Sequence, residues 1–197
     1  YITGEHFMRV NHCLLGLKGA PENTLTHVHS HEMALGQCRK LIGELDLKPM
    51  VSVDTAGAAR ELAEANEAAH GAIASKLAGE IYGLDVLREN IEDSQQNTTR
   101  FLIMSASPDD AGPEDGDVIT SFIFRVRNVP AALYKALGGF ATNNVNMIKL
   151  ESYMLGGSFE ATQFFADIQG HPKDRSVKRA LDELGYFTNR LDVIGVY

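Results

Sequence analysis

The sequence predicts an α/β protein made of two modules with a polar linker between them. In the first half of the chain, short apolar runs alternate with segments of helical spacing. In the second half, the pattern is strand, helix, strand, strand, helix, strand. The stretch between them is rich in Pro, Gly, Ser and Asp and has no hydrophobic periodicity, which is typical of a linker. We therefore expect a first module at 1–104, a linker at 105–117 and a second module at 118–197.

The first module is expected to contain a sheet covered by helices. Apolar residues recur at helical spacing over 34–45 and again over 58–63. Ser75 opens a third helix, and Gly83 fits the position just past its end. The predicted strands lie at 1–16 (one long strand or a hairpin pair), 25–29, 50–53, 72–74 and 98–104. Strands that alternate with helices indicate a parallel or mixed sheet with helices on its faces.

The second module follows the ferredoxin-like order of elements. Its predicted strands lie at 119–127, 145–154, 159–168 and 187–196, and its predicted helices at 130–141 and 173–184. Gly156-Gly157 predicts a hairpin between the two middle strands. Pro130 and Pro172 stand where the helices are expected to start, a position that suits proline.

The composition is that of a soluble globular protein. Of the 197 residues, 44% are hydrophobic and 22% are charged. The net charge of -8 argues against binding to nucleic acid or to an anionic membrane, because both need a basic patch. No apolar run approaches the roughly 20 residues of a membrane span, and Cys13 and Cys38 do not suggest a disulfide framework. We expect a cytoplasmic protein.

Three hydroxyl residues, Ser30, Thr55 and Ser75, stand between a predicted strand and the helix that follows it. In an open α/β sheet, such helix starts face a common crevice in which ligands bind. The free N–H groups and positive dipole ends of the helices favour anions, and the residues after Asp54 are small. This crevice would suit a small polycarboxylate. The alternative is that each hydroxyl only caps its helix.

Two other polar features lie close to this crevice in the sequence. Gln37 follows Ser30 by about two helical turns, so it either lines the crevice on the same face as Ser30 or is a surface residue. His27, His29 and His31 alternate, which would place them on one face of a strand and suggests a metal site. Because no fourth ligand has suitable spacing and His31 falls past the strand, we expect no metal, with a metal-dependent enzyme as an alternative.

The stretch 97–101 is the strongest candidate for chemistry. It places the hydroxyls of Thr98 and Thr99 and the guanidinium of Arg100 at the start of a strand that then becomes apolar. An arginine beside a buried strand needs an anionic partner, and its planar fork matches a carboxylate. That anion is either a ligand or, in a structural ion pair, Glu92 or Asp93.

This stretch resembles the TRF signature of prephenate dehydratases in its pattern Asn97-x-Thr99-Arg100-Phe101. Its surroundings are similar to that family in the same order: Gly4-Glu5, Asn11-His12-Cys13-Leu14-Leu15, His29-Ser30-His31, Gln37-Cys38, Asp54-Thr55-Ala56-Gly57-Ala58-Ala59, Ala74-Ser75 and Tyr82-Gly83-Leu84. The second module resembles the ACT regulatory domain of these enzymes at Ala132-Leu133, Asn146-Met147-x-Lys149-Leu150-Glu151-Ser152 and Asp167-Ile168-x-Gly170-His171. The resemblance covers essentially all of the chain.

The resemblance implies an enzyme that converts prephenate to phenylpyruvate, water and carbon dioxide in phenylalanine biosynthesis, without a cofactor. It also implies that the first module is part of a catalytic domain with a type II periplasmic-binding-protein-like fold. By resemblance, Thr99 donates a hydrogen bond to the leaving hydroxyl, and Arg100 binds an anion or supports the site. The residues expected to bind substrate are Ser30, Gln37, Asp54, Thr55, Asn97 and Phe101.

The ACT-like module implies feedback regulation by L-phenylalanine. Such modules pair with a copy of themselves and build ligand sites between subunits, so we expect a homodimer or homotetramer. A helix start near the site can receive the effector's carboxylate. The residues expected around the effector are Val129, Pro130, Ala131, Ala132, Leu133, Asn146, Met147, Glu151 and Ser152, with Asn128 in the same loop.

The sequence departs from the family pattern in three places. It starts at Tyr1 in an extended pattern and without the family's N-terminal segment, so we expect a fragment that folds but is inactive alone. Tyr153-Met154 replaces the usual Arg-Pro of the regulatory motif, and Asn144 replaces a glycine. The main alternative to an enzyme is an amino-acid-responsive binding protein of similar fold, which would not need the Thr99-Arg100 pair.

Overall fold

The structure, a computed structural model, describes residues 1–94, 96–127, 129–156 and 161–197. Its internal contacts divide the chain into two compact units. We call Phe7–Thr99 the N-terminal unit, and we call Tyr1–His6 together with Arg100–Tyr197 the C-terminal unit. Each unit has its own sheet and its own apolar core.

The N-terminal unit is built on a five-stranded mixed sheet. Its strands are β2 (Cys13–Gly16), β3 (His27–Ser30), β4 (Lys48–Val51), β5 (His70–Ala74) and β6 (Asp85–Glu89). Their order across the sheet is β4-β3-β5-β2-β6. Strand β3 is parallel to β4 and β5, whereas β2 is antiparallel to β5 and β6. The predicted mixed α/β sheet is confirmed.

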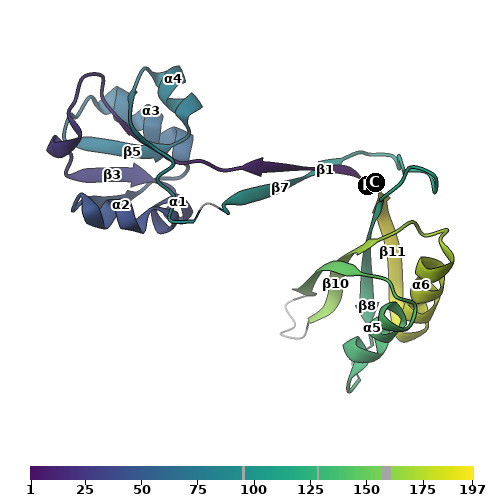
Figure 1. Cartoon of the computed structure of the whole chain (residues 1–197). Helices are drawn as coiled ribbons and strands as arrows, with labels where there is room; N and C mark the ends of the chain where they lie inside the picture. Colours follow the sequence, from purple (N-terminus) through teal and green to yellow (C-terminus); the bar gives the residue numbers. More distant parts are fainter. Residues whose placement is uncertain (95, 128, 157–160) are drawn as a thin grey trace. The chain divides into compact units, whose positions relative to one another are not determined.

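Helices cover both faces of this sheet. They are α1 (Glu32–Gln37), α2 (Arg39–Glu44), α3 (Thr55–Ala65) and α4 (Lys76–Tyr82), with a 3-10 turn at Glu22–Thr24. Figure 1 shows α3 and α4 on one side of β3 and β5, and α1 and α2 on the other. Along β2, Leu14 belongs to the core under α1 and α2, while Cys13 and Leu15 belong to the core under α3 and α4. A central strand that is covered on both faces is therefore apolar at every position.

The C-terminal unit has the strand-helix-strand-strand-helix-strand order that the sequence predicts. Its elements are β8 (Ile119–Val126), α5 (Ala132–Thr142), β9 (Met147–Met154), β10 (Ala161–Gln169), α6 (Arg175–Phe187) and β11 (Thr188–Val196). The sheet order is β11-β8-β10-β9, and all neighbouring strands are antiparallel. The ferredoxin-like prediction is confirmed.

Both helices of this unit pack on one face of its sheet. The centre of that core is formed by the buried rings of Phe122, Phe124, Phe140 and Phe164, whose neighbouring centroids lie 5.2 to 5.9 Å apart. Because side chains alternate along a strand, Ser121 of β8 and Phe165 and Asp167 of β10 point to the opposite face. We call this opposite face the outer face of the C-terminal sheet.

Strands β1 (Ile2–Arg9) and β7 (Thr98–Met104) pair with each other in a separate two-stranded sheet, as Figure 1 shows. The division between the units passes through both strands, after His6 in β1 and after Thr99 in β7. At the start of β1, Ile2 is buried, and its backbone occupies the space that a side chain on Gly195 of β11 would need. Close approach to the C-terminal sheet therefore requires a glycine at this point.

Several expectations about the first module, residues 1–104, are wrong. The predicted strand over 98–104 is not buried, since Phe101 is 47% and Met104 64% exposed. The single helix expected over 34–45 is two helices, because the backbone leaves the helical conformation at Cys38. Strand β4 starts two residues before the predicted start at 50. Strand β6 was missed because its sequence, DVLRE, is too polar to read as a sheet strand.

In the C-terminal unit, the prolines do not stand at the first residue of a helix. α5 begins two residues after Pro130 and α6 three residues after Pro172. Gly156 has a left-handed φ of 61° after β9, while Gly157 and Asn128 lie outside the described residues.

The polar stretch between the modules contains no regular structure. No helix or strand lies between Met104 and Ile119, all of which the structure describes. The expected domain limits, with a linker at 105–117, stay a prediction.

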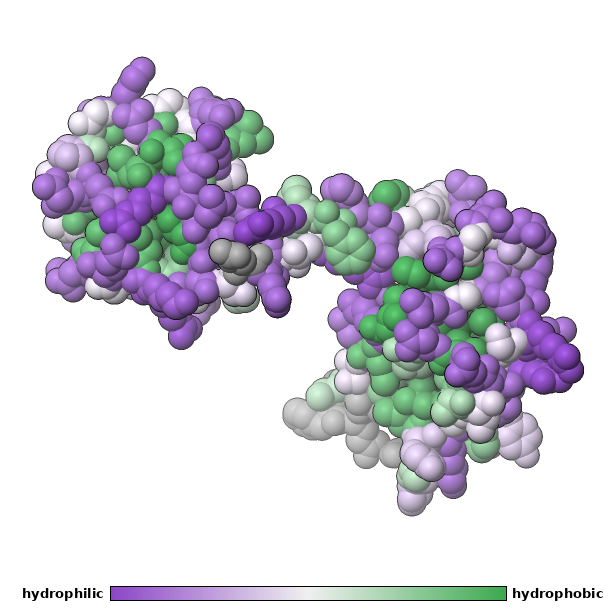
Figure 2. Space-filling model, in the orientation of Figure 1, coloured by the Kyte–Doolittle hydropathy of each residue, from purple (hydrophilic) through white to green (hydrophobic). Residues whose placement is uncertain are grey.

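The face of each unit that is visible in Figure 2 is largely polar. Figure 2 shows hydrophilic residues over most of the visible face of each unit, with smaller apolar areas between them. Of the helices in the described part of the chain, none is both long enough and apolar enough to span a membrane.

Three histidines meet beside α3 in the N-terminal unit. His70 of β5 has ring centroids 4.8 Å from His27 and 5.0 Å from His29, both on β3. His70 Nδ1 lies 3.1 Å from His29 Nε2 and 3.1 Å from a Glu67 carboxylate oxygen. His31 lies past the strand, as predicted. Across the described ranges, no group of three or more His, Cys, Asp or Glu side chains is arranged to hold a metal ion.

The histidine cluster makes stability depend on pH. Burial lowers the pKa of His29, and the imidazoles of His70 and His27 lower it further. As pH falls below the ordinary histidine pKa of 6.5, the unfolded chain binds the proton before the folded chain does. We predict that the free energy of unfolding falls between about pH 7 and pH 5, and that His29→Gln reduces this slope. Denaturant titrations over that range measure it.

The matched control is His6→Gln, which removes an exposed histidine from the other unit. Equal slopes for the wild type and His29→Gln would contradict the prediction.

Candidate functional site

A hollow of about 320 Å³ lies at the carboxyl ends of β3 and β4, and we call it the crevice. Its wall combines the start of α3, one face of α1, the segment before β2 and the start of β7. The lining residues are Val10, His12, His31, Met33, Ala34, Gln37, Asp54, Thr55, Asn97 and Thr99. The carboxyl ends of parallel strands are where open α/β sheets bind ligands. The crevice is therefore the candidate site.

A polar network fixes one side of the crevice. The side-chain oxygen of Gln37 lies 2.8 Å from His12 Nε2 and accepts a hydrogen bond of 3.1 Å from Asn97 Nδ2. Asn97 Nδ2 also donates to the carbonyl oxygen of Val10 at 3.3 Å, and Gln37 Nε2 donates to Asn97 Oδ1 at 3.4 Å. Both amides are therefore held in one orientation at the wall. The crevice reading of Gln37 is favoured over the surface reading.

His12 is a lining residue to which the sequence analysis gave no role. It is only 5% exposed, and its backbone N–H donates to the buried carboxylate of Glu92 at 3.0 Å. Its ring nitrogen contacts Gln37. The signal available in the sequence was a polar pair, Asn11-His12, directly before the apolar strand β2.

The helix starts differ from the expected caps. Ser75 caps α4, since its hydroxyl accepts a hydrogen bond of 3.1 Å from Ala78 N–H. The cap of α3 is Asp54, whose carboxylate accepts from Gly57 N–H at 2.6 Å. Thr55 is the first residue of that helix and lines the crevice. The capping prediction is confirmed for Ser75 and wrong for Thr55.

Ser30 does not line the crevice. It is the last residue of β3 and fully buried, and its hydroxyl donates to the carbonyl oxygen of Ile73 at 2.6 Å. The cap of α1 is instead His31, whose ring nitrogen accepts from Met33 N–H. Ser30 and Gln37 therefore do not share a helix face. In the structure, Ser30 joins β3 to β5 beneath the site.

Thr99 and Arg100 are neighbours on β7, but the structure does not place them together. Thr99 lines the crevice of the N-terminal unit. The Arg100 guanidinium contacts Glu5, Asp167 and Tyr197 in the C-terminal unit, and Phe101 also belongs to that unit. The structural ion pair of Arg100 is therefore made with Glu5 and Asp167 rather than with Glu92 or Asp93.

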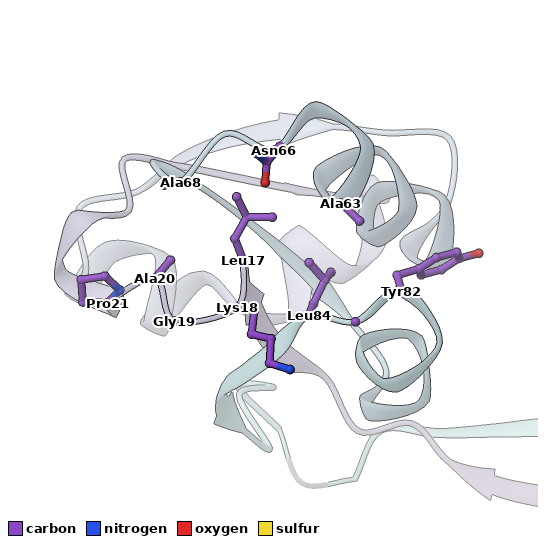
Figure 3. Close-up of a pocket in the computed structure, with 11 residues that line it drawn as sticks. Leu17, Lys18, Gly19, Ala20, Pro21, Ala63, Asn66, Ala68, Tyr82 and Leu84 are labelled. Atoms are coloured by element: carbon purple, nitrogen blue, oxygen red, sulfur yellow. The ribbon is translucent and has the colours of Figure 1, made fainter.

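A larger hollow of about 580 Å³ lies elsewhere in the N-terminal unit (Figure 3). It is lined by Leu17, Ala63 and Leu84 among others. Because β2 pairs antiparallel with β5, Leu17 lies near the amino end of β5. The crevice lies at the carboxyl ends of the parallel strands, on the opposite side of the sheet along the strand direction. In Figure 3, the ends of the Lys18 and Tyr82 side chains point away from Leu17 and Leu84. Size alone therefore does not make this hollow the candidate site.

The residues expected around an effector lie in two regions of the C-terminal unit. Ala132 and Leu133 of α5 and Met147 of β9 pack against its core. Before α5, Val129 and Pro130 are exposed, and Ala131 has a left-handed φ of 58°. Asn146 Nδ2 donates to Gln169 Oε1 at 2.8 Å, and both residues line a hollow of about 470 Å³ beside Phe140.

Glu151 and Ser152 point to opposite faces of the C-terminal sheet. Ser152 lies opposite Phe164 of the core, whereas Glu151 lies opposite Phe165 on the outer face. The Glu151 carboxylate accepts a hydrogen bond of 2.7 Å from Tyr153, which lowers the pKa of Glu151, and Lys149 lowers it further. Glu151 and Ser152 therefore cannot both contact one ligand on a single face of this sheet.

Comparison with known proteins shows similarity to prephenate dehydratases along the whole chain. A family model described as prephenate dehydratase matches residues 1–109. Over its full length, the chain is 50% identical to a bifunctional N-acyl-homoserine lactone acylase/prephenate dehydratase of Komagataeibacter europaeus, and it covers 70% of that protein. It is 34% identical, over 211 aligned residues, to arogenate dehydratase/prephenate dehydratase 1, chloroplastic, of Arabidopsis thaliana, and it spans 54% of that protein.

A solved structure agrees with this context. The prephenate dehydratase of Arthrobacter aurescens, in complex with L-Phe, superimposes on the whole chain with a TM-score of 0.85 at 26% identity. The chain covers 65% of that structure. The sequence therefore spans about half to two thirds of several of the proteins that it matches.

Substitutions of Asp54 test its role as the N-cap of α3. Asp54→Ala removes the acceptor for Gly57 N–H, so we predict a loss of about 1 kcal/mol in the free energy of unfolding. Asp54→Ser keeps a capping oxygen and should retain most of the stability. Denaturant titration of the two variants measures the difference, and equal losses in both would contradict the capping role.

Proposed function

The chain belongs to the prephenate dehydratase family, and on that premise we propose that the protein converts prephenate to phenylpyruvate at the crevice. The position of Thr99 carries the proposal. This hydroxyl lines the carboxyl-end hollow of an α/β sheet together with the fixed amides of Gln37 and Asn97. The proposal is made for the protein as its gene encodes it, because this chain spans only part of its relatives.

The chemistry fits a site of neutral donors. In the reaction, the bond from the ring to one carboxylate breaks and releases carbon dioxide. The electron pair of that bond enters the ring, the C–O bond breaks, and hydroxide leaves as the ring becomes aromatic. Negative charge therefore develops on the leaving oxygen, where a donor stabilises the transition state more than the substrate. We assign that donor to the Thr99 hydroxyl.

The remaining crevice residues would hold the substrate. We propose that the amides of Gln37 and Asn97 bind oxygen atoms of the substrate. Hydrogen bonds fix the orientation of both amides. A substrate carboxylate fits the start of α3, where Thr55 adds a hydroxyl to the positive end of the helix dipole. Asp54 would act here through its cap, which shapes that helix start. Phe101 and Ser30 do not line the crevice, so they act at most indirectly.

Loss of the Thr99 hydroxyl should affect turnover more than binding. For Thr99→Ala we predict that kcat falls by about 100-fold, while KM changes by about twofold or less. Thr99→Ser keeps the donor and should retain most of the activity. The release of phenylpyruvate from prephenate measures both constants. The assay uses the protein as its gene encodes it, because residues 1–197 span only about half the length of two of the relatives.

The matched control is Thr98→Ala, which removes a neighbouring hydroxyl of β7 that does not line the crevice. An effect of Thr99→Ala on KM alone would contradict the donor role. No turnover by the wild type, with phenylalanine binding retained, would favour an amino-acid-responsive binding protein.

We also propose that L-phenylalanine binds the C-terminal unit of a homo-oligomer and lowers activity. A related structure was solved in complex with L-Phe. In this chain, α5 begins without a side-chain cap. The N–H of Ala132 donates to the carbonyl oxygen of Val129, and the next N–H groups of the first turn would receive a carboxylate. At the other end of α5, Asn146 offers an amide close to Gln169 in the hollow beside Phe140, so a single ligand would contact both regions only where they come from two copies of the chain. An exposed edge strand, β9, is available for pairing with a second copy.

The amide of Asn146 gives a direct test. We predict that Asn146→Ala weakens L-phenylalanine binding by about tenfold, as expected for one lost hydrogen bond to a charged ligand. Calorimetric titration measures the affinity. Asn143→Ala is the control, because it removes an amide of the same unit that does not line this hollow. Equal affinity for Asn146→Ala and the wild type would exclude Asn146 as a ligand contact.

A second candidate activity rests on the relative that is 50% identical over the whole chain. Its name includes N-acyl-homoserine lactone acylase as well as prephenate dehydratase. We therefore propose amide hydrolysis of such lactones as an alternative, with a fatty acid and homoserine lactone as products. The same preparations, incubated with an N-acyl-homoserine lactone, test it through release of both products.

A further inference from the structure

The histidine cluster, formed by His27, His29 and His70, lies on the sheet face that α3 covers. Strands β3 and β5 are parallel, with His27 paired to His70 and His29 paired to Ala72, so these side chains share one face. Ala72 and Leu62 of α3 belong to the same apolar core on that face. All of these residues lie in the N-terminal unit.

A hollow of about 200 Å³ lies where the imidazoles meet the C-terminal half of α3. It is lined by His29, Glu61, Leu62, Ala65, Glu67 and His70. The helix ends at Ala65, and Asn66 then takes a left-handed conformation with φ 54°. The end of α3 is therefore next to the cluster, and the hollow leaves room for an imidazole ring to move.

The hydrogen bonds of the cluster accommodate one added proton. His70 Nδ1 lies 3.1 Å from His29 Nε2 and 3.1 Å from a Glu67 carboxylate oxygen. In the neutral cluster, one proton lies between the two imidazole nitrogens, because their contact needs a donor and an acceptor. When His70 is protonated, its Nδ1–H donates towards Glu67 and towards His29 Nε2. The first added proton therefore preserves the contact.

A second added proton breaks this contact. With His29 protonated as well, His29 Nε2 and His70 Nδ1 would both carry hydrogen atoms, and two donors would face each other at 3.1 Å. Burial lowers the pKa of His29, and the charges of His70 and His27 lower it further, while Glu61 and Glu67 raise it. The closed cluster therefore resists the second proton, and a form with separated rings accepts it.

The other charges around the cluster do not favour a second proton. Lys48 of β4 is paired with His27 across β3 and β4, so it adds a positive charge on the same face. On α3, Arg60 and Glu64 form an exposed ion pair of their own at 3.8 Å. The Glu67 side chain is 59% exposed, so water screens its attraction for a cation.

We propose that the histidine cluster is an acid-sensitive switch, which keeps the C-terminal half of α3 on the sheet at neutral pH and releases it when a second proton binds. α3 is one continuous helix, and Thr55 at its other end lines the crevice. Release of its last turns therefore loosens the wall of the crevice that its first turn forms. The switch itself is independent of the reaction, and only its effect on turnover rests on the proposed function.

Hydrogen exchange of the protein as its gene encodes it tests the switch. Between about pH 7.5 and about pH 5.5, we expect the protection of the amides at 58–66 to fall by at least about tenfold, after correction for the intrinsic pH dependence of exchange. His29→Gln cannot bind the second proton, so its loss should be about twofold or less. His6→Gln is the matched control and should respond as the wild type does. Helix α5, which contains no histidine, should keep its protection in all of these proteins.

Glu67→Gln should change the response in the opposite direction. The closed cluster then lacks the carboxylate that stabilises its first added proton, whereas the open cluster binds protons as before. The α3 amides should therefore lose protection at a higher pH than in the wild type. Glu64→Gln is the control, because it removes an exposed carboxylate of α3 that does not line the hollow. Since Glu67 is largely exposed, this comparison does not depend on whether His29→Gln folds.

The pH dependence of KM supplies a second readout. Over the same range, KM for prephenate should rise by at least about fivefold in the wild type and by less in His29→Gln, with the rate without enzyme subtracted. The same exchange response in the wild type, His29→Gln and Glu67→Gln would overturn the proposal. An unchanged KM would overturn the effect on the crevice. A wild type without turnover at any pH would reject the dehydratase function instead, and the exchange comparison would still decide the switch.

Discussion

The structure depends on a charge that has no access to water. Asp167 is fully buried on the outer face of the C-terminal sheet, and its carboxylate is neutralised by Arg100 and bound by Ser121. A carboxylate in this position needs a cation with an extended side chain, and that cation comes from β7. Because Glu5 of β1 binds the same guanidinium, both strands of the two-stranded sheet are attached at this point. Residues 1–6 thus belong to the same compact unit as residues 100–197.

The crevice also depends on residues that are distant in the sequence and close in the folded N-terminal unit. Its lining residues come from four stretches that lie far apart in the sequence, and the Gln37–Asn97 pair joins two of them across 60 residues. Mixed pairing brings the start of β2 beside the end of β5, which places His12 at the same edge as the helix starts. The site therefore depends on which strands pair with each other, because most of its lining residues stand in the segments and helices that follow or precede the strands of this sheet.

Much of the fold could be predicted from the sequence, because periodicity records which faces are buried. The ferredoxin-like unit and the alternation before it follow from the spacing of apolar residues, and Ser75 and Gly83 bound α4 as their chemistry indicates. The partners of Arg100 could not be predicted, since Glu5 and Asp167 lie 95 and 67 residues away and only the tertiary fold brings them together. The apolar composition of 98–104 indicated a buried strand, yet the strand pairs only with β1 and stays exposed. Among the expected site residues, the structure brings Gln37, Asp54, Thr55, Asn97 and Thr99 to one hollow and leaves Ser30, Arg100 and Phe101 outside it.

The kinds of side chain that line the crevice bear on the proposed chemistry. They are hydroxyl, amide, imidazole, apolar and one carboxylate side chain, and no lysine or arginine is among the described residues that line it. A cation against the departing carboxylate would stabilise the substrate more than the transition state, because the negative charge leaves that group as carbon dioxide forms. Neutral donors avoid this cost and act where charge accumulates, at the leaving oxygen. Arg100 does not line the crevice, because its guanidinium binds Asp167, and the proposed donor is the uncharged hydroxyl of its neighbour Thr99.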